Sequence, residues 1–281
     1  MKTTLITDSC CDLTPELLQN MDVRRVSFHI NVEEKSFIDN HQINLTALLA
    51  HMRACKSAVK TACPSPDDYF QEMRSAESCF VVTISGRLSG SYHSAMAARD
   101  LALAETPDKR IHVFDSKSAS SGETCVALRI EECMEAGLSF EETVENVSAY
   151  IDSLHTRFVL VHLDNLMKNG RLGKLKGVLG MMLGIYPILA DDGQGEIVML
   201  EKVRGLKQAM GRLADLLRDN LDTQLRKTTT IVISHCNCEE RALALKEQIQ
   251  TLRKDLKRIV IVPTGGLSTV YANDGGIVLA Y

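Results

Sequence analysis

Four times within the first 122 residues, an apolar, strand-like run ends in a loop of small hydroxyl residues, and each loop leads into a helix-like stretch. The runs are residues 4–7, a less regular approach to Thr61, residues 80–84 and residues 111–114. Alternating strands and helices predict a mostly parallel sheet with helices on both faces. In such a sheet the loops gather at the carboxyl ends of the strands, where helix N-termini offer N–H groups to an anion. The pattern therefore predicts a site for a small acidic group.

Several helix starts in this chain carry recognisable signals. Ser65 and Thr14 each place a capping hydroxyl directly before a proline, the residue favoured at the first helical position. Ser139, followed three residues later by Glu142, has the spacing of a capping box. We therefore expect helices to begin near residues 15, 66 and 140, and a further one near residue 92.

The second half of the chain has a different pattern. Residues 156–162 form a β-rich run after a turn near residue 154, and we place a domain boundary there. Residues 185–189 and 196–200 flank a turn and predict an antiparallel hairpin. Further helices are expected at 206–221 and 239–252, and further strands at 230–234, 259–262 and 276–281. The chain is thus predicted to be α/β with two domains: a three-layer α/β/α domain with a mostly parallel sheet over residues 1–154, and an α/β domain with a mixed sheet over residues 155–281.

Composition and charge exclude several classes of function. A formal charge of -4 gives the chain no basic field for nucleic acid, so we expect none to bind. Nine cysteines, with close pairs only at residues 10–11 and 236–238 and no repeated pairs, predict reduced thiols and no metal site. The most apolar run, residues 177–189, is shorter than the roughly 18 residues that a membrane span needs. No signal peptide precedes the first strand, and we therefore expect a cytoplasmic protein.

Motifs for common catalytic chemistry are missing from the sequence. In residues 86–90 the serine stands one position late for a nucleophile elbow. No glycine-rich dinucleotide signature and no P-loop signature occurs. The sequence therefore predicts no catalytic residue, no cofactor and no nucleotide bound by this chain.

The loop at residues 85–91 is the main candidate for an anion site. Ser85, Ser89 and Gly90 offer hydroxyls and backbone N–H groups just before a helix. Thr61 adds a second hydroxyl from a neighbouring loop. The same residue types are equally typical of helix caps and turns, so both interpretations stay open at this point.

A basic stretch and an apolar stretch follow one another between residues 168 and 189. Arg171 lies in a glycine-flanked loop that can aim its planar guanidinium at a phosphate or carboxylate, and Arg204 is a second candidate. A solvated helix face explains such charges equally well. Four nearby apolar residues have the adaptable character of a pocket for a flexible alkyl chain: Met181, Met182, Leu183 and Ile185. Ordinary core packing is the alternative for each of them.

Taken together, these motifs resemble the DegV family, the fatty-acid-binding proteins that serve as the lipid-carrying subunit of bacterial fatty acid kinase. The resemblance spans nearly the whole chain and depends on the order and spacing of the motifs. They are Thr7-Asp8-Ser9 with Asp12-Leu13, Thr61 with Pro64-Ser65, Leu88-Ser89-Gly90-Ser91-Tyr92, Asp115-Ser116-Lys117 with Ser120 and Gly122, Lys168-Asn169-Gly170-Arg171-Leu172, Pro187-Ile188-Leu189 with Asp192-Gly193, and Lys202-Val203-Arg204-Gly205.

The resemblance implies a two-domain fold with one long-chain fatty acid in a tunnel. Its carboxylate would lie near Thr61 and Ser89, beside Tyr271, which stands where the family pattern has a histidine. Arg171 would lie at the mouth, facing a partner or a phosphate. The resemblance also implies a carrier and not an enzyme, which presents the acid to a separate ATP-dependent, DhaK/DhaL-like fatty acid kinase subunit for acyl-phosphate formation. Two alternatives use the same residues: a phosphotransferase or sugar-phosphate enzyme, and an interaction module that docks a protein through its basic patch.

Overall fold

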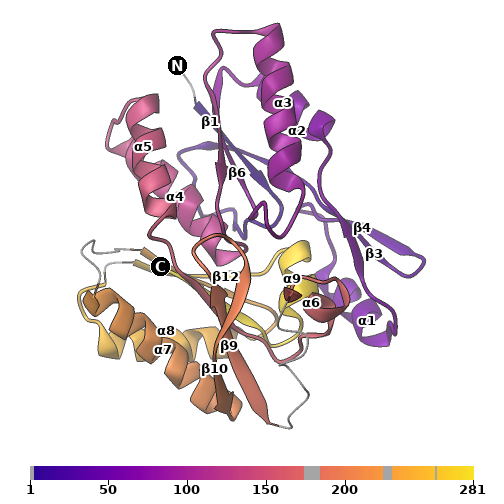
Figure 1. The fold of residues 1–281 in the computed structure, drawn as a ribbon, viewed down its shortest axis with the longest axis vertical. Coiled ribbons are helices and arrows are strands. Elements are labelled where there is room, and N and C mark those ends of the chain that lie inside the picture. The colour runs from indigo at the N-terminus through magenta and orange to yellow at the C-terminus, as the bar shows by residue number, and fades with distance from the viewer. Residues whose placement is uncertain (1–2, 174–183, 224–229, 257) are drawn as a thin grey trace.

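The computed structural model describes residues 3–173, 184–223, 230–256 and 258–281. These residues form two main sheets with helices packed on them, and a smaller third sheet at the side (Figure 1). The α/β class, with a parallel first sheet and a mixed second sheet, is confirmed.

The first main sheet is entirely parallel, with the strand order β2-β1-β6-β7. Its strands are β1 (Thr3–Asp8), β2 (Asp22–Val26), β6 (Ser78–Thr83) and β7 (Ile111–Asp115). The helices around it are α2 (Pro66–Ser75), α3 (Ser91–Glu105), α4 (Ser121–Glu135) and α5 (Phe140–Ile151). Because successive side chains of a strand point to opposite faces, Leu5 packs against α4 and α5 while Ile6 packs against α2 and α3. The result is the expected three-layer α/β/α arrangement.

The helix-start signals succeed at two places and fail at one. Ser65 and Ser139 both form complete capping boxes, at the starts of α2 and α5. The helix expected from residue 15 is wrong, because residues 15–20 form consecutive turns. Leu18 has a φ of 60°, in the left-handed region, and its side chain is buried in the core. Burial of this leucine overrides the local helix signal.

The second main sheet has the strand order β10-β9-β8-β13-β11-β12, in which β11 and β12 are the parallel pair. Its strands are β8 (Thr156–Val159), β9 (Ile185–Asp191), β10 (Ile197–Arg204), β11 (Thr230–His235), β12 (Arg258–Pro263) and β13 (Ile277–Ala280). Two long helices, α7 (Leu206–Thr223) and α8 (Glu239–Leu252), cover one face through an aliphatic cluster. The predicted β9–β10 hairpin is confirmed.

Helix α4 lies between the two main sheets and is buried on nearly all sides. One hydrophobic cluster joins its residue Val126 to Phe80 of the first sheet and to Val232 of the second. The two halves of the chain therefore share part of their core. The proposed boundary between residues 154 and 155 falls between α5 and β8 and stays a prediction.

A small antiparallel sheet, which the sequence pattern did not predict, lies beside these layers. It contains β4 (Lys35–Ile38), β3 (His29–Val32) and β5 (Lys60–Ala62), in that order. Helix α1 (Leu45–Ala54) packs on it together with α9 (Gly266–Ala272), which also contacts α6 (Asp164–Lys168). Thr61 therefore lies inside strand β5, and its expected place in a loop after a parallel strand is wrong.

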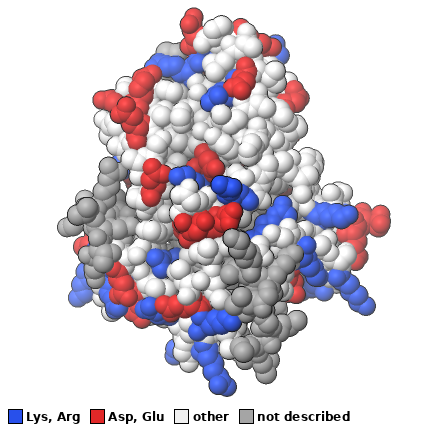
Figure 2. Space-filling model, viewed as in Figure 1, with Lys and Arg blue, Asp and Glu red and all other residues white. Residues whose placement is uncertain are grey.

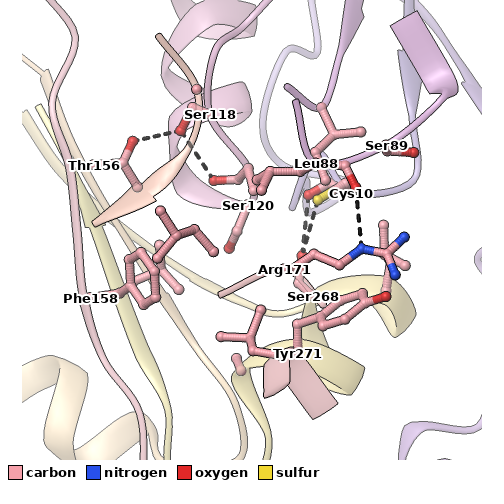
Figure 3. A pocket seen from close by; sticks show the side chains of 18 of the residues that line it. Cys10, Leu88, Ser89, Ser118, Ser120, Thr156, Phe158, Arg171, Ser268 and Tyr271 are labelled. Carbon is pink, nitrogen blue, oxygen red and sulfur yellow. Dashed lines mark hydrogen bonds between the residues drawn. The ribbon is translucent and has the colours of Figure 1, made fainter. Parts of the chain in front are cut away.

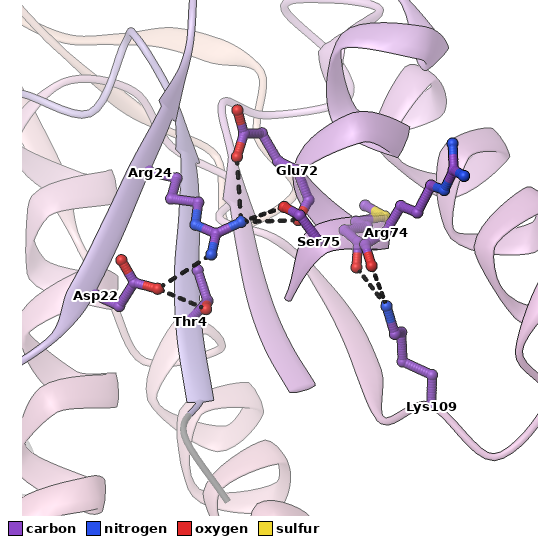
Figure 4. Close-up of polar contacts among 8 residues, drawn as sticks. Thr4, Asp22, Arg24, Glu72, Arg74, Ser75 and Lys109 are labelled. Carbon is purple, nitrogen blue, oxygen red and sulfur yellow. Dashed lines mark hydrogen bonds and ion pairs between the residues drawn. The ribbon is translucent and has the colours of Figure 1, made fainter. Parts of the chain in front are cut away.

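Hydrogen bonds and ion pairs connect α2 to residues of the first sheet and its loops (Figure 4). Arg24 on β2 donates to Asp22 (3.2 Å) and to Glu72 on α2 (3.4 Å). Lys109 Nζ donates to the carbonyl oxygens of residues 73 and 74 (2.8 and 2.7 Å), at the C-terminal end of α2, where a cation is favoured. Exposed pairs of this kind contribute about 0–1 kcal/mol each, so their main effect is on the position of the helix.

The charged side chains do not form a field of one sign on the face shown in Figure 2. Lys and Arg are interspersed there with Asp and Glu. Within the part of the chain that the structure describes, no helix is both long enough and apolar enough to cross a bilayer.

Candidate functional site

A cavity lies between the two halves of the chain (Figure 3). It contains about 860 Å³ of space free of protein atoms, including the part open to solvent. Loops after β1, β6 and β7 form one side of the wall, and β8, the β9–β10 hairpin and α9 form the other. Neither half encloses this space alone.

Apolar side chains form the middle of the cavity wall. They are Phe28, Ile84, Leu88, Phe158, Leu160, Leu166, Ile197, Leu267, Ala272 and Val278. Strand alternation explains the contribution of β8, since Phe158 faces the cavity while Val159 packs into the cluster under α7. Such a wall buries hydrocarbon and offers it no hydrogen bonds.

One end of the cavity is polar and combines residues that are far apart in the sequence. Thr61 Oγ1 and Tyr271 Oη are joined by a hydrogen bond of 2.9 Å, and both residues are partly buried. Ser89 lines the cavity beside Gly90, the N-cap residue of α3. Gly90 approaches Cys63 closely, because a Cβ on it would lie 3.3 Å from the Cys63 sulfur. Hydroxyls and free N–H groups at a helix start can together hold a carboxylate.

Arg171 lies at this same polar end. Its guanidinium carbon is 5.8 Å from the centre of the Tyr271 ring, a cation–π geometry. Its Nε donates to the carbonyl oxygen of Leu88 (3.3 Å) and its Nη1 to that of Asn169 (2.8 Å). A guanidinium has five N–H donors, so these bonds orient Arg171 without using up its capacity for an anion. Four sequence-predicted residues, Thr61, Ser89, Arg171 and Tyr271, thus meet at one end of the cavity.

Among the described residues, Ser85, Gly90, Ile185 and Arg204 are not part of the cavity wall. Ser85 is fully buried, and its hydroxyl donates to the carbonyl oxygen of Gly195 (2.8 Å) in the β9–β10 turn. Arg204 and Ile185 are paired at the open end of the same hairpin. Met181, Met182 and Leu183 lie outside the described residues.

The structure adds polar residues that sequence reasoning did not assign to the site. Ser118 Oγ and Thr156 Oγ1 lie 2.5 Å apart at the cavity wall, away from Tyr271 (Figure 3). Ser268, on α9, donates to the carbonyl oxygen of Cys10 (3.2 Å). Ser118 belongs to the hydroxyl loop that follows residues 111–114, whereas nothing in the local sequence marks Thr156 or Ser268.

Buried carboxyl groups hold the loops that carry the cavity wall. Asp8 accepts hydrogen bonds from Cys10 N (3.0 Å), Ile84 N (2.9 Å) and Ser91 Oγ (2.7 Å). Beside it, Glu123 is fully buried, and neither of its carboxyl oxygens has a hydrogen bond among the described residues. Burial, and next the charge of Asp8, raise the pKa of Glu123 well above 4.5. Burial also raises the pKa of Asp8, but its hydrogen-bond donors counteract that rise, so the proton of this pair resides on Glu123.

Replacing Glu123 with glutamine should stabilise the protein increasingly as the pH rises. A carboxyl group whose pKa is raised by folding contributes stability below its unfolded pKa, and that contribution is lost as the pH rises through the folded value. The glutamine of the Glu123→Gln variant does not ionise, so the variant keeps its stability as the pH rises. We therefore expect its unfolding free energy to exceed that of the wild type by about 1–3 kcal/mol at alkaline pH. Urea unfolding between pH 4 and pH 9 measures it. Glu141→Gln, at an exposed position of α5, is the control; an identical pH profile for wild type and Glu123→Gln would contradict the assignment.

Comparisons with known proteins match the chain over nearly its whole length. The family model described as uncharacterised proteins of the DegV family matches residues 2–281. A DegV domain-containing protein of Streptococcus pneumoniae is 36% identical over 283 residues, covering 99% of this chain and 98% of that protein.

Two solved structures share the fold over their whole length. A DegV family protein from Ruminococcus gnavus, refined with vaccenic acid, has a TM-score of 0.93 at 41% identity and covers 99% of both chains. The fatty acid kinase B3 protein of Streptococcus pneumoniae, loaded with linoleic acid, has a TM-score of 0.91 at 35% identity, covering 100% of this chain and 99% of that one. The chain therefore belongs to the DegV family.

Proposed function

We propose that this protein binds one long-chain fatty acid, with the carboxylate at the polar end of the cavity and the acyl chain along the apolar wall. The observation that carries the proposal is the hydrogen-bonded Thr61–Tyr271 pair at one end of a cavity whose middle is apolar. Ser89 and the N–H groups at the start of α3 supply further donors to the carboxylate. The acids named with the Ruminococcus and pneumococcal structures support this substrate class.

The two parts of the cavity contribute in different ways. Each CH₂ group moved from water to the apolar wall stabilises the complex by about 0.8 kcal/mol. The hydroxyls and helix N–H groups offset the loss of water by the carboxylate and fix the direction in which the acid enters. Long chains should therefore bind tightly and in one orientation.

The bound acid serves as the substrate of a separate kinase in this proposal. The pneumococcal relative carries the name of a fatty acid kinase protein, and the present chain lacks nucleotide-binding signatures. A DhaK/DhaL-like subunit in the cytoplasm would supply the phosphate, and Arg171, at the polar end, would face it. Arg204, at the end of β10, remains a second candidate for contact with that partner.

Mass spectrometry of the native protein, with gas chromatography of an organic extract, tests the proposal directly. We expect one long-chain fatty acid per chain, and no acyl-phosphate when the isolated protein is incubated with ATP. Protein that carries no lipid and binds no added fatty acid would overturn the carrier assignment. Turnover of ATP or of a sugar phosphate by the chain alone would favour the phosphotransferase alternative.

Replacing Thr61 or Ser89 with alanine should weaken fatty acid binding about tenfold in each case, because each change removes one hydrogen bond to a charged group. Displacement of a fluorescent fatty acid measures the affinity. Thr251→Ala and Ser57→Ala, at exposed positions outside the cavity, are the matched controls. Unchanged affinity in both site variants would place the carboxylate elsewhere.

A further inference from the structure

The cavity is polar at both ends, and the two ends differ in hydrogen-bonding character. The end near Tyr271 offers donors, among them the Arg171 guanidinium. At the far end Ser118, Thr156 and Asp191 line the wall. Figure 3 shows Ser118 and Thr156 pointing toward one another on the side of the cavity away from Arg171.

The far end offers mainly acceptors. Ser118 and Thr156 are only 5% and 6% exposed, and their hydroxyls lie 2.5 Å apart, so one of them donates to the other. Ser118 Oγ also has a longer contact with the carbonyl oxygen of Ala119, at 3.5 Å. Since each hydroxyl has one donor and two acceptor positions, the hydrogen bond between them leaves one donor and three acceptor positions.

Asp191 extends this acceptor surface. Its Oδ2 accepts from the backbone N–H of Thr156 (2.6 Å), and a carboxylate has further lone pairs for other donors. Glu196 lines the same end, and so does Lys117, whose ammonium donates to Asp152 (2.8 Å). The Ser85–Gly195 hydrogen bond holds the β9–β10 turn over this end.

We propose that the preferred ligand is a fatty acid with a hydroxyl group at or near the far end of its chain; the proposal rests on the fatty-acid-binding function. A methyl end would cover the buried acceptors without satisfying them, which disfavours a plain chain. A terminal hydroxyl donates a hydrogen bond to Ser118, Thr156 or Asp191. This bond replaces the one that the displaced water made. A second carboxylate has no proton to donate at pH 7 and would lie near Asp191 and Glu196, which disfavours a dicarboxylic acid.

Matched pairs of acids test this substrate class. After removal of co-purified lipid, each straight-chain acid from dodecanoic to octadecanoic is compared by competition with its ω-hydroxy and its ω-carboxy counterpart. At the length that fits the cavity, we expect the ω-hydroxy acid to bind about fivefold tighter than the plain acid, and the diacid at least about tenfold weaker.

The Thr156→Val variant keeps the side-chain shape and removes one hydroxyl, so it should cut the preference for the ω-hydroxy acid over the plain acid of the same length about fivefold. Ser118→Ala is the second variant, in case Thr156→Val does not fold. Thr7→Val is the control, because the Thr7 hydroxyl is buried without a partner among the described residues and does not line the cavity.

The outcomes separate this inference from the proposed function. Tight binding of plain acids, with ω-hydroxy acids weaker at every length, would overturn the inference and leave the carrier function intact. A preference for ω-hydroxy acids that persists in both Thr156→Val and Ser118→Ala would overturn the assignment to this end of the cavity. Binding of no acid in any series would overturn the proposed function itself.

Discussion

Replacing Tyr271 with phenylalanine should weaken the binding of a long-chain fatty acid by roughly 30- to 100-fold, equivalent to about 2–3 kcal/mol. The change removes the phenol hydroxyl and keeps the ring on which Arg171 lies. Thr61 also loses the partner that orients its hydroxyl. The effect should therefore exceed that of Thr61→Ala, in which the Tyr271 hydroxyl remains free to contact the carboxylate. Displacement of a fluorescent fatty acid gives both affinities under one set of conditions.

Two further variants make the Tyr271 test specific. Tyr186→Phe removes a phenol hydroxyl outside the cavity wall and should leave the affinity unchanged. Tyr271→His restores the residue of the family pattern, and its binding should strengthen as the pH falls through about 6.5, because an imidazolium attracts a carboxylate and a phenol stays neutral. Wild-type affinity in Tyr271→Phe would show that the phenol does not contact the acid.

The polar end of the cavity could be predicted from sequence because Thr61, Ser89 and Arg171 lie in recognisable motifs. Tyr271 is 210 residues from Thr61 and was predicted there because it stands where the family pattern has a histidine. The resemblance to the family predicted that these residues lie close together. The local pattern alone placed Thr61 in the wrong kind of element, since three residues of an edge strand carry too little periodicity to be distinguished from a loop.

The apolar wall could not be predicted in the same way. Phe158 and Val159 are neighbours on β8, and both have the character of core residues. Phe158 faces the cavity and Val159 faces α7. This difference depends on which elements from distant parts of the chain cover each face of the sheet. Alternation indicates that the two side chains diverge and does not indicate which face is hollow.

Helix α9 links the stability of the fold to the site. It carries Ser268 and Tyr271 to the cavity, and its first turn is held by the fully buried Asp39. Asp39 Oδ1 accepts from Gly266 N and its Oδ2 from Leu267 N, both at 2.7 Å. A carboxylate is favoured at a helix N-terminus, so one side chain fixes both the start and the direction of α9.

Replacing Asp39 with alanine should lower the free energy of unfolding by about 3 kcal/mol, because two buried N–H groups lose their charged acceptor. Fatty acid affinity should fall with it, since α9 no longer holds Tyr271 against Thr61. Asp39→Asn keeps one carbonyl acceptor and should lose about half as much stability. Urea unfolding and ligand displacement measure the two effects, with Asp108→Ala at an exposed turn as the control. If Asp39→Ala lost stability and kept wild-type affinity, the position of Tyr271 would depend on the wall around α9 and not on its N-terminal anchor.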